Sequence, residues 1–401
     1  MTQENQTAAL PLAGVRVLDF TRVVAGPFCT GMMADLGAEI MKVEPPSGDD
    51  QRFMGAVVGS VSANFEFINR NKKSIKLDLK NAEALALVKE LVEQADVVVE
   101  NFRPGVTKRL GIDYASLKAI NPKIIYCSIS GFGQEGSMAK LPSYDVIAQA
   151  MSGFMSVTGE EGRAPVFAGD SIGDTVSGVY AAWAISTALF QRERTQQGQH
   201  LDIAMFDSLL SLLPTAVTQY QVTGVAPKRT GNRHPLSAPF GSYQAKDGYI
   251  IIAVANQILF TRLCETMGMP EILDDPRFAS DSIRCENEAA LRALIEGWAS
   301  DYPVEEAVQL LSQAGVPASP VLDVEQALDN VQVSERQLFT QIDHPELGSF
   351  KLPEQPVKFG DVARGQQKQA PTLGADGEAL LKDVLGWSDE KIRDLKARNI
   401  I

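Results

Sequence analysis

The chain has 401 residues, of which 45% are hydrophobic and 22% are charged, and its formal net charge at pH 7 is -13. This length is enough for two domains, each with its own core, and the composition is that of a folded protein rather than a disordered or collagen-like one. The negative charge argues against nucleic acid or an anionic membrane as a partner, because both attract clustered Lys and Arg.

The first residues and the cysteines indicate the compartment. Met1–Ala9 has neither the basic nor the apolar region of a signal peptide, and no apolar run approaches the roughly 18 residues that span a bilayer. The four cysteines lie far apart and form no CxxC pair, so neither a zinc site nor a disulfide framework is indicated. We therefore expect a cytoplasmic protein. Three histidines without HExxH or paired spacing predict no metal site.

Six short β-rich runs alternate with amphipathic segments between Val15 and Phe206. The runs are VRVLDF, AEIMKVE, SIKLDL, ADVVVENF, KIIYCSIS and HLDIAMF. Between them, residues Ala82–Ala95 show the clearest helical stripe of apolar side chains. This alternation predicts an α/β fold with a parallel sheet covered on both faces. Ligands of such folds bind at the carboxyl ends of the strands.

Two basic stretches follow or precede predicted strands. Arg70, Lys72 and Lys73, in NRNKKS, favour a solvated turn. The stretch after ADVVVENF suits phosphate groups, although a solvated helix face explains it equally well. Its polar and basic residues are Asn101, Arg103, Lys108 and Arg109.

The segment GFGQEG, Gly131–Gly136, matches the dinucleotide fingerprint GxGxxG after a strand. That fingerprint needs its third glycine to begin a helix whose first turn meets a pyrophosphate. Here Pro142 follows six residues later, so no long helix can begin at once. We predict a glycine-rich loop beside the ligand cleft rather than a nicotinamide or flavin site.

The segment GDSIGDTVSG contains two aspartates, Asp170 and Asp174. Asp174 precedes TVSGVYAAWAISTALF, which predicts a buried helix, so its carboxylate should lie near the start of that helix. Backbone N–H groups there favour the ionised form. An N-cap is the commonest role of Asp at such a place, so the residues alone leave the cap and the catalytic interpretation of Asp174 open.

Residues Gly224–Pro239 are rich in Pro, Gly and basic residues and predict a linker. In it, Arg229, Arg233 and His234 suit a distal substrate carboxylate, although a solvated linker explains them equally well.

A second unit follows the linker, with the strand YIIIAVA and three helices. The tail contains a Pro/Gly-rich stretch, HPELGSFKLPEQPVKFG, and a terminal helical pattern, SDEKIRDLKARNII; periodicity assigns it to neither unit. The three helices are expected near Leu259–Met267, Glu288–Ser300 and Val304–Ala314.

Seven blocks, in their order and spacing, resemble the class III CoA-transferases, the family of formyl-CoA and carnitine-CoA transferases. They are PLAGVRVLDFTRVVAGPFCTGMMADLGAEIMKVEPP, NRNKKSIKLDL, ADVVVENFRPG, LGIDYASL, SISGFGQEG, SYDVIAQAMSG and FAGDSIGDTVSG. The resemblance covers almost the whole chain. It implies a Rossmann-like large domain with a parallel sheet, built from residues 1–224 and 330–401, a smaller α/β domain from residues 225–329, and an interlocked-ring homodimer.

The resemblance also implies the site. The family's catalytic aspartate falls on Asp174, because GDTVSG matches its motif. Val24 stands where formyl-CoA transferase has glutamine, and Pro45 where it has an arginine used for CoA, which counts against formyl or oxalyl specificity. The implied CoA contacts are Val24, Ala25, Leu77, Lys80, Asn101, Phe102, Arg103, Arg109, Tyr144 and Asp145, with Arg109 as the phosphate ligand.

The activity implied is transfer of CoA between carboxylic acids through a mixed anhydride and an aspartyl-CoA thioester on Asp174. The oxyanion donors stay open between Gly131–Gly136 and the backbone near Asp174. No tightly bound cofactor is expected, and acyl-CoA is a substrate. We expect succinyl-CoA or another small dicarboxyl-CoA as donor, and malate, mesaconate, itaconate or glutarate as acceptor.

Two alternatives to CoA transfer remain. An α-methylacyl-CoA racemase needs an acid/base pair at the α-carbon, and racemases carry His where this chain has Tyr144. A noncatalytic acyl-CoA-binding protein would bind thioesters without exchange.

Overall fold

The computed structural model describes residues 9–401. Within these residues it divides into two compact units. The large unit comprises residues 9–154, 167–215 and 334–401, and the small unit comprises residues 155–166 and 216–333. No helix in the described part of the chain combines the length and the apolar character needed to cross a membrane.

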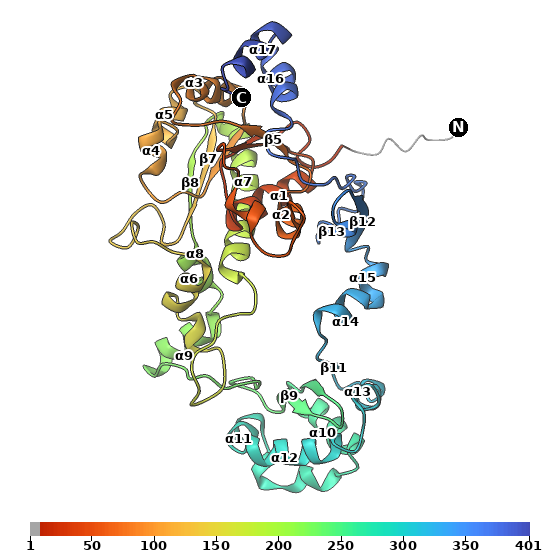
Figure 1. Ribbon diagram of the computed structural model, residues 1–401. Coiled ribbons are helices and arrows are strands. Elements are labelled where there is room, and N and C mark those ends of the chain that lie inside the picture. Colours follow the sequence, from red (N-terminus) through yellow and green to blue (C-terminus); the bar gives the residue numbers. More distant parts are fainter. Residues whose placement is uncertain (1–8) are drawn as a thin grey trace, which may run out of the picture. The chain divides into compact units, whose positions relative to one another are not determined.

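The large unit is built on a six-stranded parallel sheet with the strand order β5-β2-β1-β6-β7-β8. Figure 1 labels β5, β7 and β8 of this sheet. All six β-rich runs of the sequence form strands of this sheet, so the predicted α/β fold with a parallel sheet is confirmed. The order reverses between β1 and β6, which pair directly with each other. The strands are β1 (Arg16–Asp19), β2 (Glu39–Glu44), β5 (Lys73–Lys76), β6 (Val97–Glu100), β7 (Ile125–Ser130) and β8 (His200–Ala204).

Apolar side chains cover both faces of the sheet. Successive residues of a strand point to opposite faces, so Val17 and Leu18 of β1 belong to two separate core clusters. The cluster of Leu18 includes α3 (Ala82–Glu93) and the C-terminal helices α16 (Gly377–Leu385) and α17 (Asp389–Ala397). The cluster of Val17 includes α1 (Ala25–Asp35) and α7 (Ile172–Thr195). Burial on both faces explains the nearly continuous apolar strands.

Helix α7 is buried on one side only. Gly178 meets α1 so closely that a Cβ there would lie 2.8 Å from the carbonyl oxygen of Ala25. On the other side, Val179, Trp183 and Phe190 are 45%, 66% and 62% exposed. The prediction that this whole segment is a buried helix is therefore wrong for one face.

The small unit has a three-stranded antiparallel sheet, with β10 (Tyr249–Ala253) between β9 (Phe240–Gln244) and β11 (Ala318–Pro320). Ile250 and Ile252 of β10 face a core formed with the helices. The predicted strand and all three predicted helices are present. The helices are α10 (Gln257–Thr266), α12 (Glu288–Ala299) and α13 (Val304–Gln313).

Shorter elements complete the chain. In the large unit they are β3 (Val57–Val58), β4 (Val61–Ser62), α2 (Ala63–Asn69), α4 (Val106–Leu110), α5 (Tyr114–Lys118), α6 (Asp145–Met151), α8 (Met205–Ser211), β12 (Phe339–His344), β13 (Gly348–Pro353) and the 3-10 turn η1 (Asp50–Phe53). In the small unit they are α11 (Asp281–Glu286), α14 (Val324–Asp329), and the 3-10 turns η3 (Pro270–Asp274) and η4 (Pro276–Phe278). The elements α9 (Pro214–Thr223), α15 (Val331–Glu335) and η2 (Phe154–Ser156) lie at the junctions.

Candidate functional site

A cavity of about 550 Å³ lies among the loops that follow β1, β6 and β7 in the large unit. It lies at the carboxyl edge of the sheet, where the strand order reverses and where such folds bind ligands. Its volume is in the usual range of small-molecule sites. It is lined by Arg22, Val23, Val24, Ala25, Asp50, Asn101, Phe102, Arg103, Pro104, Val106, Ile129, Ser130, Gly131, Ala139, Leu141, Ser143, Tyr144, Asp174 and Met205.

Most of the predicted site residues meet at this cavity. Those in its lining are Val24, Ala25, Asn101, Phe102, Arg103, Tyr144 and Asp174. Four others are absent from its lining. Leu77 lies in the core, Lys80 and Arg109 are exposed elsewhere, and Asp145 is buried beside Asp174.

The loops after β1 and β6 are joined by the side chain of Asn101. Its Oδ1 accepts from the N–H of Arg22 at 2.9 Å, and its Nδ2 donates to the carbonyl of Arg22 at 2.7 Å. The amide is thus engaged in shaping one wall of the cavity. Arg103 differs, because its guanidinium has no hydrogen-bond or ion-pair partner among residues 9–401 and is exposed at the cavity.

Asp174 is the third residue of α7, and Ser171 occupies the N-cap position. The alternative that Asp174 is only an N-cap is therefore wrong. Within the described chain, the Asp174 carboxylate accepts no hydrogen bond, whereas its backbone N–H donates to Asp145 Oδ1 at 3.3 Å. Burial, with a smaller contribution from the nearby Asp145 carboxylate, raises the pKa of Asp174 to about 7. The expectation that the helix start favours ionisation is overturned, because desolvation and like charge outweigh the helix dipole.

Asp145, the first residue of α6, holds the first turn of α7. Its Oδ1 accepts from the N–H groups of Gly173 at 2.6 Å and Asp174 at 3.3 Å, and its Oδ2 accepts from Gln149 at 2.6 Å. These bonds satisfy backbone donors that a helix start leaves open. A Cβ at Gly173 would lie 2.8 Å from Asp145 Oδ1, so the glycine permits this approach. The geometry makes Asp145 a neighbour of Asp174 rather than part of the cavity lining.

Beneath the loop after β1 lies a buried ion pair. The Lys42 ammonium is 2.9 Å from Asp49 Oδ2 and donates to the carbonyl of Thr21 at 2.8 Å. Asp49 Oδ1 accepts from the N–H of Val23 at 3.0 Å. Val23 has a φ of 65°, which is strained for a β-branched residue and persists only when its surroundings impose it. The ion pair therefore fixes the loop that carries Val24 and Ala25. A lysine within the apolar strand EIMKVE was the signal for it.

The interpretation of NRNKKS as a solvated turn is wrong for two of its three cations. The Arg70 guanidinium pairs with Asp35, and the Lys72 ammonium lies 3.2 Å from Asp19 Oδ2, with all of these groups buried. Burial lowers the pKa of Lys72 to about 8, although Asp19 opposes this. The carboxylates make burial of the cations tolerable. Only Lys73 is partly exposed.

The glycine-rich segment Gly131–Gly136 is a loop, and no helix begins between it and Asp145, as predicted. Gly131 lines the cavity, and its carbonyl accepts from the N–H of Phe206 at 3.0 Å. Ser130, before it, is a lining residue that the sequence did not indicate. Its buried hydroxyl has no hydrogen-bond partner in the part of the chain that the structure describes.

The basic residues of the predicted linker make contacts within the small unit. Arg229 Nη2 donates to the carbonyl of Arg163 at 2.6 Å, and the ring of His234 stacks on Phe240 with centroids 5.0 Å apart. The carbonyl of Arg233 accepts from the Thr230 hydroxyl at 2.9 Å. Arg229 and His234 thus have structural roles there.

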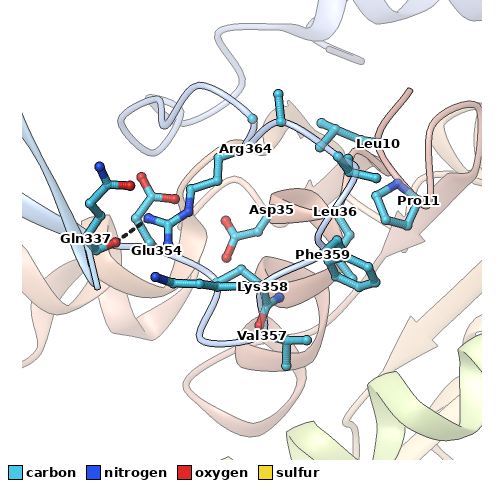
Figure 2. A pocket seen from close by; sticks show the side chains of 14 residues that line it. Leu10, Pro11, Asp35, Leu36, Gln337, Glu354, Val357, Lys358, Phe359 and Arg364 are labelled. Carbon is cyan, nitrogen blue, oxygen red and sulfur yellow. Dashed lines mark hydrogen bonds between the residues drawn. The ribbon is translucent and has the colours of Figure 1, made fainter. Parts of the chain in front are cut away.

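A second cavity, of about 180 Å³, lies elsewhere in the large unit and contains none of the predicted site residues (Figure 2). Arg364 donates to the carbonyl of Gln337 on one side, and the Asp35 carboxylate is already paired with Arg70. The larger cavity with Asp174 is therefore the candidate active site.

Comparisons with known proteins agree over nearly the full length. The profile of CoA-transferase family III matches residues 12–377. The acetyl-CoA:oxalate CoA-transferase of Acetobacter aceti is 43% identical over 376 residues, which cover 93% of this chain and 95% of that protein. The succinyl-CoA:glutarate CoA-transferase of Mus musculus is 35% identical over 401 residues, covering 100% of this chain and 92% of that protein.

A crystal structure of a CAIB/BAIF family protein from Brucella suis has a TM-score of 0.84 and 38% identity, and the match covers 94% of this chain and 100% of that one. The resemblance seen in the sequence, and with it the prediction of a transferase enzyme, is confirmed. The chain belongs to CoA-transferase family III.

Proposed function

We propose that this protein transfers CoA from succinyl-CoA, or another small dicarboxyl-CoA, to a small carboxylic acid by covalent catalysis at Asp174. One observation carries the proposal. The Asp174 carboxylate lines the cavity formed by the loops after β1 and β6, and its oxygens are free of hydrogen bonds from the described residues. A partly desolvated carboxylate with free lone pairs is suited to attack on a thioester.

The reaction proceeds through acyl and CoA intermediates at the Asp174 carboxyl group. Asp174 attacks the thioester carbonyl, the C–S bond breaks, and a mixed anhydride and CoA thiolate result. The thiolate then attacks the aspartyl carbonyl, so the first acid leaves and an aspartyl-CoA thioester remains. The acceptor carboxylate attacks the carbonyl of this thioester, which expels CoA thiolate and forms a second mixed anhydride. The thiolate then attacks the acyl carbonyl of the acceptor, so the new acyl-CoA forms and the Asp174 carboxylate is regenerated. No oxidant, reductant or metal ion enters the balance.

The substrates are proposed from the activities for which relatives are named, together with the sequence. Those names include acetyl-CoA and succinyl-CoA as donors, and oxalate and glutarate as acceptors. The deciding experiment is a rate screen of both donors against oxalate, malate, mesaconate, itaconate and glutarate. Transfer from succinyl-CoA to a C4 or C5 dicarboxylate supports the proposal. Exchange confined to acetyl-CoA and oxalate would replace the proposed substrates.

The CoA moiety is proposed to lie against Val24, Ala25, Phe102 and Tyr144, with Asn101 shaping the wall. Leu77, Lys80, Arg109 and Asp145 remain proposed CoA contacts on the family resemblance alone. Arg103 has a free guanidinium at the cavity, which suits a CoA phosphate better than the exposed Arg109 outside the lining.

The Arg103→Ala variant is expected to raise the KM for the acyl-CoA about tenfold or more, with a small change in kcat. KM should rise because the variant loses charge-assisted hydrogen bonds to a CoA phosphate, each of which contributes about 1.5–3 kcal/mol to binding. Steady-state kinetics at saturating acceptor measure the effect. Lys89→Ala, at an exposed site on α3, is the control and should match the wild type. An unchanged KM would remove Arg103 from the CoA site.

The Asp145→Asn variant is expected to move the pH midpoint of kcat/KM to lower pH. Attack requires ionised Asp174, so activity should rise with pH through about 7 in the wild type. The substitution removes a like charge, while the amide oxygen still accepts from Gly173. The pH profile from pH 5 to 9 is measured for this variant and for Asp170→Asn, whose profile should match the wild type. An unmoved midpoint in Asp145→Asn would contradict the electrostatic coupling.

The racemase alternative lacks the histidine of its acid/base pair in this geometry. Tyr144 stands at the cavity, and no histidine belongs to its lining in the described structure. Incorporation of solvent deuterium at the α-carbon of a chiral acyl-CoA would support racemisation. CoA transfer requires no such exchange.

We also propose an interlocked homodimer in the cytoplasm. The family resemblance supports the dimer, as does the exposed apolar face of α7 formed by Val179, Trp183 and Phe190. Light scattering after size exclusion tests it, and a monomeric mass at micromolar concentration would exclude it. The four free cysteines support a reducing compartment.

A further inference from the structure

Glu100 is the last residue of β6 and lies directly before the cavity-lining residues Asn101, Phe102 and Arg103. Its side chain is buried, and Oε2 turns back to accept from the N–H of Phe102 at 2.8 Å. This bond closes a turn between the end of the strand and the loop. The carboxylate therefore contacts the backbone of the loop without belonging to the lining of the cavity.

A hydrogen-bond chain continues from Glu100 across the sheet to the surface. Ser128 on β7 is the cross-strand neighbour of Glu100, and as a hydrogen-bond donor its hydroxyl lowers the pKa of the Glu100 carboxyl. Ser128 Oγ also lies 2.9 Å from Nε2 of His200 on β8. A hydroxyl has one proton to donate, so when Glu100 is ionised Ser128 donates to it and accepts from the Nε2–H of His200. His200 is exposed on one side and is stacked on Tyr114, with centroids 5.3 Å apart.

The charged groups that face Glu100 do not offset the cost of burying its ionised carboxylate. Asp202 on β8 is a like charge, while Tyr126 and Cys127 on β7 are neutral, and burial lowers the pKa of His200. No cation forms an ion pair with Glu100 among residues 9–401. Burial, and to a lesser extent Asp202, raise the pKa of Glu100 to about 7.

We propose that Glu100 is a positioning residue whose carboxylate, through its bond to the Phe102 N–H, holds the 101–103 loop in the conformation that binds CoA. The chain Glu100–Ser128–His200 sets the pH at which the bond between Glu100 and Phe102 weakens. The role in CoA binding rests on the proposed function. The ionised carboxylate accepts from both Phe102 and Ser128. Once protonated, it donates to Ser128 and becomes a weaker, neutral acceptor for Phe102.

The test compares wild type, Glu100→Gln and the exposed control Glu93→Gln. Calorimetry measures the Kd of CoA from pH 6 to 9. CoA has phosphates that titrate near the lower end of this range, and they affect all three proteins alike. Glutamine accepts from Phe102 and donates to Ser128, as protonated Glu100 does. We expect Glu100→Gln to bind about fivefold more weakly than wild type at pH 8, and equally at pH 6. Glu93→Gln should follow the wild type throughout.

Hydrogen exchange of the 101–103 amides, without CoA, provides a second measurement. At pH 8 the Phe102 amide should exchange more slowly in the wild type than in Glu100→Gln, and the two should converge at pH 6. Equal exchange in both proteins at every pH overturns the positioning role. If the exchange difference is present while neither protein binds CoA, the loop role stands and the proposed CoA site falls.

The Ser128→Ala variant tests the hydrogen-bond chain separately. Loss of the Ser128 hydroxyl removes a bond that favours ionised Glu100. The difference in Phe102 amide exchange between a protein with Glu100 and its Glu100→Gln counterpart should therefore have its pH midpoint at higher pH. An unchanged midpoint would limit the pH-dependent positioning of the loop to Glu100 and Phe102, and it would overturn the role assigned to Ser128 and His200.

Discussion

The Asp174→Asn variant is expected to lose CoA transfer by at least about a thousandfold in kcat, because removal of a covalent nucleophile leaves only binding and electrostatic contributions. Rates are measured with the best donor and acceptor from the substrate screen. Mass spectrometry of the enzyme quenched during turnover should find an acyl or CoA adduct on Asp174 in the wild type and none in the variant. Turnover by a wild type that never carries an adduct at residue 174 would refute the covalent mechanism.

Two matched measurements separate chemistry from folding. Asp170 lies four residues earlier on the exposed turn before α7, so Asp170→Asn should retain activity within about twofold. Asp174→Asn should bind CoA as tightly as the wild type does. Loss of CoA binding in Asp174→Asn would indicate a role in binding rather than as the nucleophile.

The same substitution is expected to stabilise the fold at alkaline pH. The pKa of Asp174 rises from 3.8 to about 7 on folding, so the folded state binds the proton more tightly than the unfolded state does. The wild type therefore loses stability as pH rises from about 4 to about 7. Asn cannot ionise, and the gain for the variant at pH 8 is about 1–3 kcal/mol once access of water to the cavity is allowed for. Denaturant unfolding at pH 5 and pH 8 measures it.

Much of the large unit could be predicted from the sequence because its sheet is parallel. Burial on both faces leaves short, nearly continuous apolar runs such as VRVLDF and ADVVVENF, and each of them forms a strand. The hairpin of β12 and β13 was missed, since a two-stranded ribbon with half-exposed, mixed side chains has no such run. The inclusion of residues 155–166 in the small unit has no local signal, because it depends on contacts with residues distant in sequence.

The candidate site shows the same limit. The loops after strands could be located by topology, and they bring Val24 and Asn101 to one cavity with Asp174, the third residue of α7. The buried pairs beneath it could not be located, because a charged residue in a sequence is solvated on average. Lys42 within the apolar strand EIMKVE was a signal of burial, but its partner is known only from the structure. Lys72 and Asp19 are separated by more than fifty residues, and they approach each other because β2 pairs with β1 on one side and with β5 on the other.

The Asp49→Ala variant is expected to lose about 3–5 kcal/mol of unfolding free energy. Lys42 and Asp49 have side chains that are 0% and 1% exposed, so removal of one partner leaves a buried, uncompensated charge. The bond to the Val23 N–H is lost as well, and with it the support of a strained backbone. Denaturant unfolding followed by circular dichroism measures the loss.

The adjacent aspartate supplies the control for this effect. Asp50 pairs with Arg22 at 3.3 Å, but these side chains are 59% and 41% exposed, so Asp50→Ala should cost less than about 1 kcal/mol. The two substitutions remove the same chemical group one residue apart, and they differ in burial and in what the carboxylate holds. Equal stability losses would show that the buried pair of Lys42 and Asp49 does not fix the loop after β1. The conformation of Val23–Ala25 would then be maintained by the remaining contacts of the large unit.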